Sequence, residues 1–269
     1  MKKDFHMHIF NRFAQQVKKS GLFARSTTET RLKKFIETLR PVTCSKKLIR
    51  IGLGSDGGYL VPDDLVGIAA CFSPGVSDVA DFEIDLERRF GIPSYLADFS
   101  VSGPPEGLIP AGFLKKYVGA QSDERTITLT EWIESSNFGP PGDLLLQMDI
   151  EGSEYETILS TPNEILQQFR IVVVEFHAFG KLKNPYYFDI YLKTVSKLTE
   201  IFDVVHLHPN NCCGNAVLKN MEIPRVLEVT FLRKDRVFDA LPTRDFPHPL
   251  DQRNVLAHEE LLLPEIWYR

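Results

Sequence analysis

Two long apolar runs constrain the fold of this chain more than any other feature. DLLLQMD (residues 143–149) and RIVVVEFH (residues 170–177) are apolar along most of their length and end in charged or polar residues. Uniformly apolar strands are typical of a parallel sheet that helices cover on both faces. EGSEYETILS follows the first run and PYYFDIYLKTVSKLTEIF follows the second, and both are expected to form helices. The alternation predicts an α/β fold with a doubly wound, mostly parallel sheet.

The last strands are expected to break the parallel pattern. FDVVHLHPNN and PRVLEVTFLRKD both have the composition of strands, and no helical segment separates them. Parallel neighbours need a long crossover, so this arrangement predicts an antiparallel last strand.

The glycine-rich stretch RIGLGSDGGYLVP contains a G-x-G-x-x-G pattern at Gly52, Gly54 and Gly57. This pattern marks a dinucleotide-binding turn only where a strand precedes it and a helix starts within it. Here Gly58, β-favouring residues and Pro62 follow, and they do not open a helix. The stretch therefore predicts a hairpin with strands at residues 48–51 and 59–61. Upstream, helical spacing of apolar residues predicts a helix from Thr27 that ends before a proline.

The first strand of the core is predicted at residues 68–71, running into Ser73-Pro74-Gly75. VSDVADFEIDLERRFG is expected to form the next helix, capped by Ser77 or Asp78, with an apolar face of Val79, Phe82, Leu86 and Phe90. A second strand at residues 94–98 ends on Asp98, and a third is expected at residues 113–118. Strand, turn, helix and strand in this order form a βαβ unit.

Polar residues collect at the predicted strand ends, where ligands bind in open α/β sheets. We expect cofactor contacts from Ser73, Gly75, Asp98 and Asp149, because glycine permits close backbone approach and a carboxylate can bind both ribose hydroxyls. The turn S-P-G-V-S-D has a proline and an acid, which disfavour a pyrophosphate. S-adenosylmethionine carries no phosphate and suits this turn better. The other residues at strand ends are Glu151, Glu175, His177, His208, Asn210 and Asn211.

Composition limits the location and partners of the chain. No apolar run approaches the length of a membrane span, and no secretory signal is recognised, so we expect a cytoplasmic protein with free thiols and no integral membrane segment. Residues 1–50 hold 13 Lys/Arg against three acids. Such a basic segment can contact an anionic membrane surface or an acidic partner. The alternative is a solvated helical extension packed on the acidic body. No nucleic-acid partner is expected.

Several blocks resemble the FkbM-type S-adenosylmethionine-dependent methyltransferases. LLLQMDIEGSEYETIL is similar to their K-I-D-V-E-G-x-E-x-x-x-L block, and DGGYLVPDDL, SPGVSDVADFEIDLERRFG and VVVEFH match further blocks across residues 48–236. The first turn departs from the common methyltransferase pattern E/D-x-G-x-G-x-G. The resemblance implies a class I methyltransferase (Rossmann-like) fold of seven strands with the last antiparallel. Its expected divisions are an N-terminal helical extension at 1–45, the methyltransferase domain at 46–236 and a C-terminal tail at 237–269.

The resemblance also implies an activity and its residues. The expected reaction is methyl transfer, usually to oxygen, on a sugar, glycan or secondary metabolite. Gly75 and Asp98 correspond to cofactor-binding positions, and Asp149, Glu151 and Glu154 form the acidic block. The block containing Tyr59 is expected to line the cofactor or acceptor pocket.

Two routes can activate an acceptor hydroxyl. In one, His177 or His208 is the general base. In the other, Asp149 with Glu175 or His177 holds Mg²⁺. Contacts to the substrate are expected from four residues: Tyr59, Glu151, Asn210 and Asn211. A nucleotide-sugar or nicotinamide-dependent enzyme, or a non-catalytic binding domain of the same fold, remains the alternative function.

Overall fold

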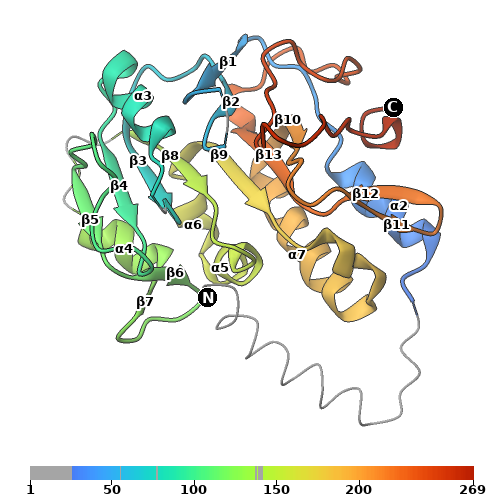
Figure 1. Cartoon of the computed structure of the whole chain (residues 1–269), viewed down its shortest axis with the longest axis horizontal. Coiled ribbons are helices and arrows are strands. Elements are labelled where there is room, and N and C mark those ends of the chain that lie inside the picture. Colours follow the sequence, from blue (N-terminus) through green and yellow to red (C-terminus); the bar gives the residue numbers. More distant parts are fainter. Residues whose placement is uncertain (1–25, 55, 77, 137, 139–141) are drawn as a thin grey trace.

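A seven-stranded sheet forms the centre of the protein. The computed structural model describes residues 26–269, apart from 55, 77, 137 and 139–141. The strand order is β10-β13-β9-β8-β3-β4-β5, and in Figure 1 the strands run from β5 at the left to β10 at the right. Only β13 is antiparallel to its neighbours in this sheet, as predicted. The strands are β3 (Ile68–Pro74), β4 (Ser94–Ala97), β5 (Gly112–Leu114), β8 (Asp143–Met148), β9 (Phe169–Phe176), β10 (Phe202–Pro209) and β13 (Leu227–Arg233).

Both faces of this sheet are buried, which explains the apolar strand sequences. Alternate residues of a strand point to opposite faces. Leu144 and Leu146 pack under α2 (Glu29–Thr38), α4 (Leu129–Ser135), α5 (Glu154–Ser160), α6 (Asn163–Leu166) and α7 (Pro185–Ile201). Leu145 and Val173 pack on the other face, under α3 (Asp81–Phe90) and the β1–β2 hairpin.

The glycine-rich stretch forms a hairpin and not a dinucleotide-binding turn. Its strands are β1 (Leu48–Ile51) and β2 (Tyr59–Pro62), which pair antiparallel. The hairpin is fastened to the sheet where the hydroxyl of Thr230 donates a hydrogen bond to the carbonyl of Leu60 at 2.7 Å. The prediction for this stretch is confirmed, and its position places the hairpin turn near the carboxyl ends of the central strands (Figure 1).

The prediction of the first core helix was wrong at its start. Helix α3 begins at Asp81, after an N-cap at Ala80 that makes no side-chain capping hydrogen bond. Val79 is 51% exposed and lies outside the apolar face assigned to it. The segment before Asp81 stays in a loop beside the strand ends, so Asp78 does not cap the helix. The other proposed cap, Ser77, is outside the described residues.

The other differences between the predicted and the observed strands involve short strands. Residues 113–118 do not form one strand: β5 belongs to the main sheet, and β6 (Tyr117–Gly119) pairs with β7 (Thr126–Thr128) in a separate two-stranded sheet. A second hairpin, β11 (Asn215–Leu218) and β12 (Met221–Pro224), was not predicted. Strands of three or four residues carry little periodic pattern, and in these two places no turn signal compensated for it.

The two ends of the described chain pack on the sheet domain. Helix α2 inserts Phe35 against Phe179 and Phe188, and Trp267 of η3 (Glu265–Trp267) stacks on Phe179. Most of the basic segment predicted to contact a membrane surface or an acidic partner lies outside the described residues. Within the part of the chain that is described, no helix combines the length and apolar character needed to cross a membrane.

Candidate active site

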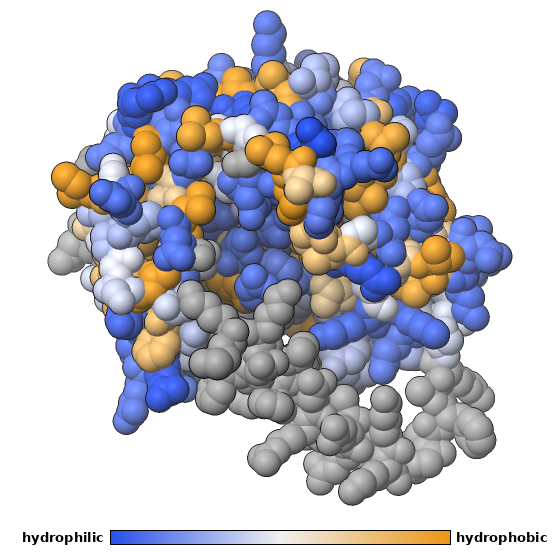
Figure 2. Space-filling model, in the orientation of Figure 1, coloured by the Kyte–Doolittle hydropathy of each residue, from blue (hydrophilic) through white to orange (hydrophobic). Residues whose placement is uncertain are grey.

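The candidate site lies at the carboxyl edge of the sheet, where β3, β8 and β9 end. From β3 the sheet continues through β4 and β5 on one side, and through β8 and β9 on the other. Ligands of open α/β sheets bind at such a reversal of strand order. Figure 2 shows that this face of the molecule is hollowed at its centre and that the hollow is hydrophilic.

Gly75 is explained by a close approach of two strand ends. Its φ of +90° is unfavourable for other residues, and a Cβ atom there would lie 1.6 Å from the carbonyl oxygen of Asp149. The glycine therefore allows the turn after β3 to pack directly against the end of β8. A cofactor contact by Gly75 stays a prediction, because the backbone it approaches in this structure is the protein's own.

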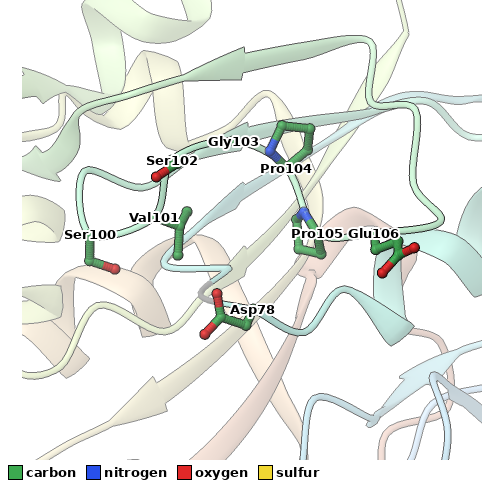
Figure 3. Close-up of a pocket in the computed structure, with 8 residues that line it drawn as sticks. All are labelled: Asp78, Ser100, Val101, Ser102, Gly103, Pro104, Pro105 and Glu106. Atoms are coloured by element: carbon green, nitrogen blue, oxygen red, sulfur yellow. The ribbon is translucent and has the colours of Figure 1, made fainter.

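Asp98 sits at the start of a loop that borders a cavity. It is buried, and its Oδ1 accepts a hydrogen bond from the backbone N–H of Ser100 at 2.6 Å. The cavity has a volume of about 510 Å³ and is lined by Asp78 and residues 100–106. Figure 3 shows Asp78 on one side and the loop curving around the other. Among the described residues, its lining includes two carboxylates, those of Asp78 and Glu106, and no Lys or Arg.

Ser73 and Tyr59 belong to a buried polar chain beneath this rim. The Ser73 hydroxyl lies within hydrogen-bond distance of a Glu83 carboxylate oxygen and, at 2.6 Å, of Gln147 Oε1. Gln147 Nε2 donates to the Tyr59 hydroxyl at 3.2 Å. Both predicted ligand contacts thus have their hydroxyls inside the protein, and these roles stay predictions. Burial raises the pKa of Glu83 to about 7, although the Ser73 hydroxyl opposes the shift.

Asp149, Glu175 and His177 converge at the ends of β8 and β9. One donor atom from each of these three residues lies within 4.8 Å of the other two. His177 Nε2 is 3.7 Å from Asp149 Oδ1 and 3.5 Å from Glu175 Oε1. The exposed carboxylate of Glu151 also reaches to 3.7 Å from the same nitrogen. The structure therefore brings together the three residues that the sequence predicted as metal ligands, and two of them, Asp149 and His177, were also predicted as catalytic groups.

Glu154 fixes the orientation of the His177 ring from behind. Its Oε1 is 3.0 Å from His177 Nδ1 and also accepts hydrogen bonds from the backbone N–H groups of Ile150 and Gly152. Nδ1 is also 3.1 Å from the carbonyl oxygen of Glu175. Both neighbours of Nδ1 are acceptors, so this nitrogen carries a hydrogen and Nε2 faces the cluster. The sequence placed Glu154 in the acidic block without showing this contact.

The cluster has perturbed protonation. Burial raises the pKa of Asp149 to about 7, and burial together with the charge of Asp149 raises the pKa of Glu175. Burial alone would lower the pKa of His177, but the hydrogen bond and charge of Glu154, with the charges of Glu175 and Asp149, raise it to about 11. Three titratable groups with perturbed pKa values thus lie in one small space, which marks the cluster as a candidate functional site.

Two further features mark the cluster. Of the five described non-glycine residues with a left-handed backbone, two, Glu151 (φ 57°) and Ala178 (φ 63°), follow the ends of β8 and β9. Such conformations cost energy and concentrate at active sites and binding sites. Among the described residues, Glu175 Oε2 and Asp149 Oδ1 are buried side-chain oxygens without a hydrogen-bond partner.

His208 lies in a second polar cluster, one strand beyond. Glu228 on β13 is paired with Glu175 on one side and with His208 on the other, and its Oε2 is 3.1 Å from His208 Nδ1. Burial lowers the pKa of His208, but the charge and hydrogen bond of Glu228, together with the charges of Asp251 and Glu260, raise it to about 9. Asn210 links the clusters, because its Nδ2 donates to Glu175 Oε1 at 3.1 Å. Sequence reasoning missed Glu228, although a single acid inside the apolar strand VLEVTF was a detectable signal.

Asn211 points away from the cluster and holds the C-terminal segment. Its Nδ2 donates to the carbonyl oxygens of Val255, His258 and Glu259, and its Oδ1 accepts from the N–H of Val255. Its predicted contact with substrate stays untested, and the observed contacts give it a structural role. The sequence held no signal for this role, because the partners are backbone groups more than 40 residues away.

Comparison with known proteins identifies the domain that carries this site. Residues 84–202 match the family model described as the Methyltransferase FkbM domain. No curated protein and no solved structure matches the chain. The matched segment contains Asp98 and the whole cluster of Asp149, Glu175 and His177. This match to an FkbM methyltransferase domain supports a methyltransferase.

Proposed function

We propose that the protein is an S-adenosylmethionine-dependent methyltransferase that methylates a hydroxyl oxygen of a sugar, glycan or secondary metabolite. The observation that carries the choice of cofactor is the acid-lined cavity of about 510 Å³ between Asp78 and the loop of residues 100–106, which follows Asp98 in the chain. Cavities of this size hold small ligands. The cavity lies between the turn after β3 and the loop after β4, at the carboxyl edge of the sheet (Figure 3).

The charge of the cavity favours a sulfonium cofactor over a dinucleotide. A pyrophosphate is bound by backbone N–H groups at a helix start or by basic side chains. Here α3 starts only at Asp81, after a loop that contributes the carboxylate of Asp78 to the cavity. Carboxylates repel a pyrophosphate and attract the positive sulfur of S-adenosylmethionine. The residues present therefore fit the cofactor that the family implies, and they do not favour NAD.

The chain has residues that could bind the cofactor and residues that could bind and deprotonate the acceptor. Asp98 would hold the ribose hydroxyls. When bound, S-adenosylmethionine supplies a methyl group on a positively charged sulfur. The acceptor hydroxyl would lie at the cluster of Asp149, Glu175 and His177, where a carboxylate can take its proton. The deprotonated oxygen would be the nucleophile for the methyl group, and the sulfur would be the leaving group. The acidic rim favours an acceptor without negative charge.

Calorimetry with S-adenosylmethionine and NAD tests this proposal. We expect S-adenosylmethionine to bind and NAD to give no heat. The Asp98→Ala variant should bind S-adenosylmethionine about 10- to 100-fold more weakly, since hydrogen bonds to a charged group contribute about 1.5–3 kcal/mol. Asp235→Ala is the matched control, because Asp235 follows β13 at the opposite edge of the sheet and is exposed. Absence of S-adenosylmethionine binding, or equal affinity for the Asp98 variant, would contradict the assignment.

Activity separates an enzyme from a binding domain of the same fold. Transfer of labelled methyl groups to a panel of glycans and hydroxylated metabolites is the expected result. If the protein binds the cofactor but Asp149→Asn leaves transfer unchanged, the acceptor site proposed here is wrong.

A further inference from the structure

The geometry points to a divalent transition-metal site in which Asp149, Glu175 and His177 are the ligands and Glu154 positions His177, with Mn²⁺ preferred over Mg²⁺. Only the role of the ion, which is to hold the acceptor hydroxyl, rests on the proposed function. Binding of the ion stands on the geometry of the cluster alone.

The separations of the donor atoms suit a small ion. Metal–ligand bonds of about 2.0–2.2 Å with angles between about 90° and 120° place neighbouring donor atoms about 2.8–3.8 Å apart. His177 Nε2 lies 3.5 Å from Glu175 Oε1 and 3.7 Å from Asp149 Oδ1. These distances are too long for hydrogen bonds and fall within the range of a shared ion. Glu151 Oε2, also 3.7 Å from Nε2, borders the same point from the exposed side.

An unpartnered buried oxygen gives independent support. Glu175 is 4% exposed, and its Oε2 has no hydrogen-bond partner among the described residues. A buried carboxylate oxygen without a partner is costly, and a bound cation is one of its explanations. Glu175 Oε1 is fixed by Asn210 Nδ2 at 3.1 Å, so the carboxylate is held in place beside His177.

Glu154 supplies the support that metal-binding histidines usually have. Such a histidine donates its other ring N–H to a carboxylate or a carbonyl, which fixes the tautomer and the ring orientation. His177 Nδ1 is within hydrogen-bond distance of both kinds of acceptor, Glu154 Oε1 and the carbonyl oxygen of Glu175. Its Nε2 is thereby presented to Asp149 and Glu175. A histidine that only forms ion pairs with acids does not require this arrangement, in which two acceptors hold Nδ1 and Nε2 is left to face the two carboxylates.

The donor set determines the kind of ion. Carboxylates suit Mg²⁺, Ca²⁺ and Mn²⁺, whereas imidazole suits the transition metals. A set with two carboxylates and one imidazole favours an ion that accepts both, and Mn²⁺ does. This refines the Mg²⁺ expected from the sequence. The side chain of Asp149 is 30% exposed, so the position of the ion is open to an acceptor hydroxyl from the hollow.

The test is a metal titration of the full-length protein after chelation. Mn²⁺ binding is followed by loss of the electron paramagnetic resonance signal of the free ion, and Mg²⁺ binding by calorimetry. We expect one Mn²⁺ per chain and an affinity at least about tenfold above that for Mg²⁺. Pulsed resonance of the bound Mn²⁺ should show coupling to an imidazole nitrogen. No binding at millimolar Mn²⁺, equal affinity for Mg²⁺, or no nitrogen coupling overturns the proposal, and none of these readouts depends on a variant.

Variants separate the ligands from the positioning residue. Asp149→Asn and Glu175→Gln should each weaken Mn²⁺ binding more than about 100-fold, and Glu154→Gln about 10- to 100-fold with nitrogen coupling retained. Glu260→Gln is the control: this partly exposed acid lies beside His208, and its removal should change affinity less than about fivefold. Unchanged affinity in folded Asp149 and Glu175 variants overturns the site.

Measuring S-adenosylmethionine binding on the same samples keeps the two proposals apart. Cofactor binding without Mn²⁺ binding overturns the metal site alone. Mn²⁺ binding without cofactor binding overturns the proposed function and supports the metal site.

Discussion

Replacing Glu83 with glutamine would test whether Glu83 is protonated in the buried polar chain of Glu83, Ser73, Gln147 and Tyr59. Burial raises the pKa of Glu83 from 4.5 to about 7 in the folded protein. Between these values the folded state holds a proton that the unfolded state has released. Stability therefore falls as pH rises from 4.5 through 7. The gap corresponds to about 3 kcal/mol, at about 1.36 kcal/mol for each unit of pKa.

The contacts of Glu83 explain how a protonated carboxyl fits this place. The Ser73 hydroxyl has one hydrogen, and it faces both Glu83 and Gln147 Oε1. If the protonated Glu83 donates to Ser73, Ser73 can donate to Gln147, and Gln147 donates to Tyr59. Other titratable groups near Glu83 are Asp81 on the same helix and the Cys71 thiol on β3. Glutamine offers the same donor and acceptor without a charge.

Urea unfolding at two pH values measures the effect. Glu83→Gln should match the wild type at pH 5 and exceed its free energy of unfolding by up to about 3 kcal/mol at pH 8.5. Glu87→Gln, on the exposed face of the same helix, is the matched control and should change stability by less than about 0.5 kcal/mol at both values. A Glu83→Gln variant that is less stable than the wild type at pH 8.5 would refute the reasoning, because it would mean that the carboxylate is stabilised in the fold.

Two further predictions concern the strand ends and the C-terminal segment. Gly75→Ala should lower the free energy of unfolding in urea titrations by more than about 3 kcal/mol, because the added Cβ would overlap the carbonyl of Asp149. Gly91→Ala is the control: a Cβ there has nothing within 4 Å, so this variant should cost only about 1 kcal/mol. Equal losses of stability in the two variants would contradict this prediction, because they would mean that the backbone moves to remove the overlap at residue 75. Asn211→Ala should make residues 251–260 the first site of limited proteolysis, because the variant loses the hydrogen bonds from Nδ2 to three backbone carbonyls. An unchanged cleavage pattern would show that other contacts hold the segment.

Much of the fold could be predicted because burial leaves a pattern in the sequence. The strands β8 and β9 are covered on both faces, so they are apolar along most of their length and stand out in the sequence. The start of α3 could not be predicted, because Val79 continues the helical spacing but lies in an exposed loop. The strands β5 and β6 were merged for a similar reason: which sheet a three-residue strand joins depends on its neighbours in space.

The candidate site was also partly readable. Asp149, Glu175 and His177 could be grouped in advance, since parallel strands bring their carboxyl ends to one edge. The contacts that orient them could not. Glu228 reaches the site because β13 inserts between β9 and β10, and Asn254 bridges Glu228 and Asp56 from a segment far along the chain.

The sequence by itself determined the class of fold, the edge of the sheet where the candidate site lies and the acids that mark it. These follow from local periodicity and from residues at strand ends, which neighbouring residues encode. Tertiary structure alone decided that Gly75 makes room for Asp149, that Glu154 turns Nε2 of His177 toward the cluster, and that Asn211 serves the C-terminal segment. Each of these depends on which segments the sheet order places side by side, and that order is not written in any one stretch of the chain.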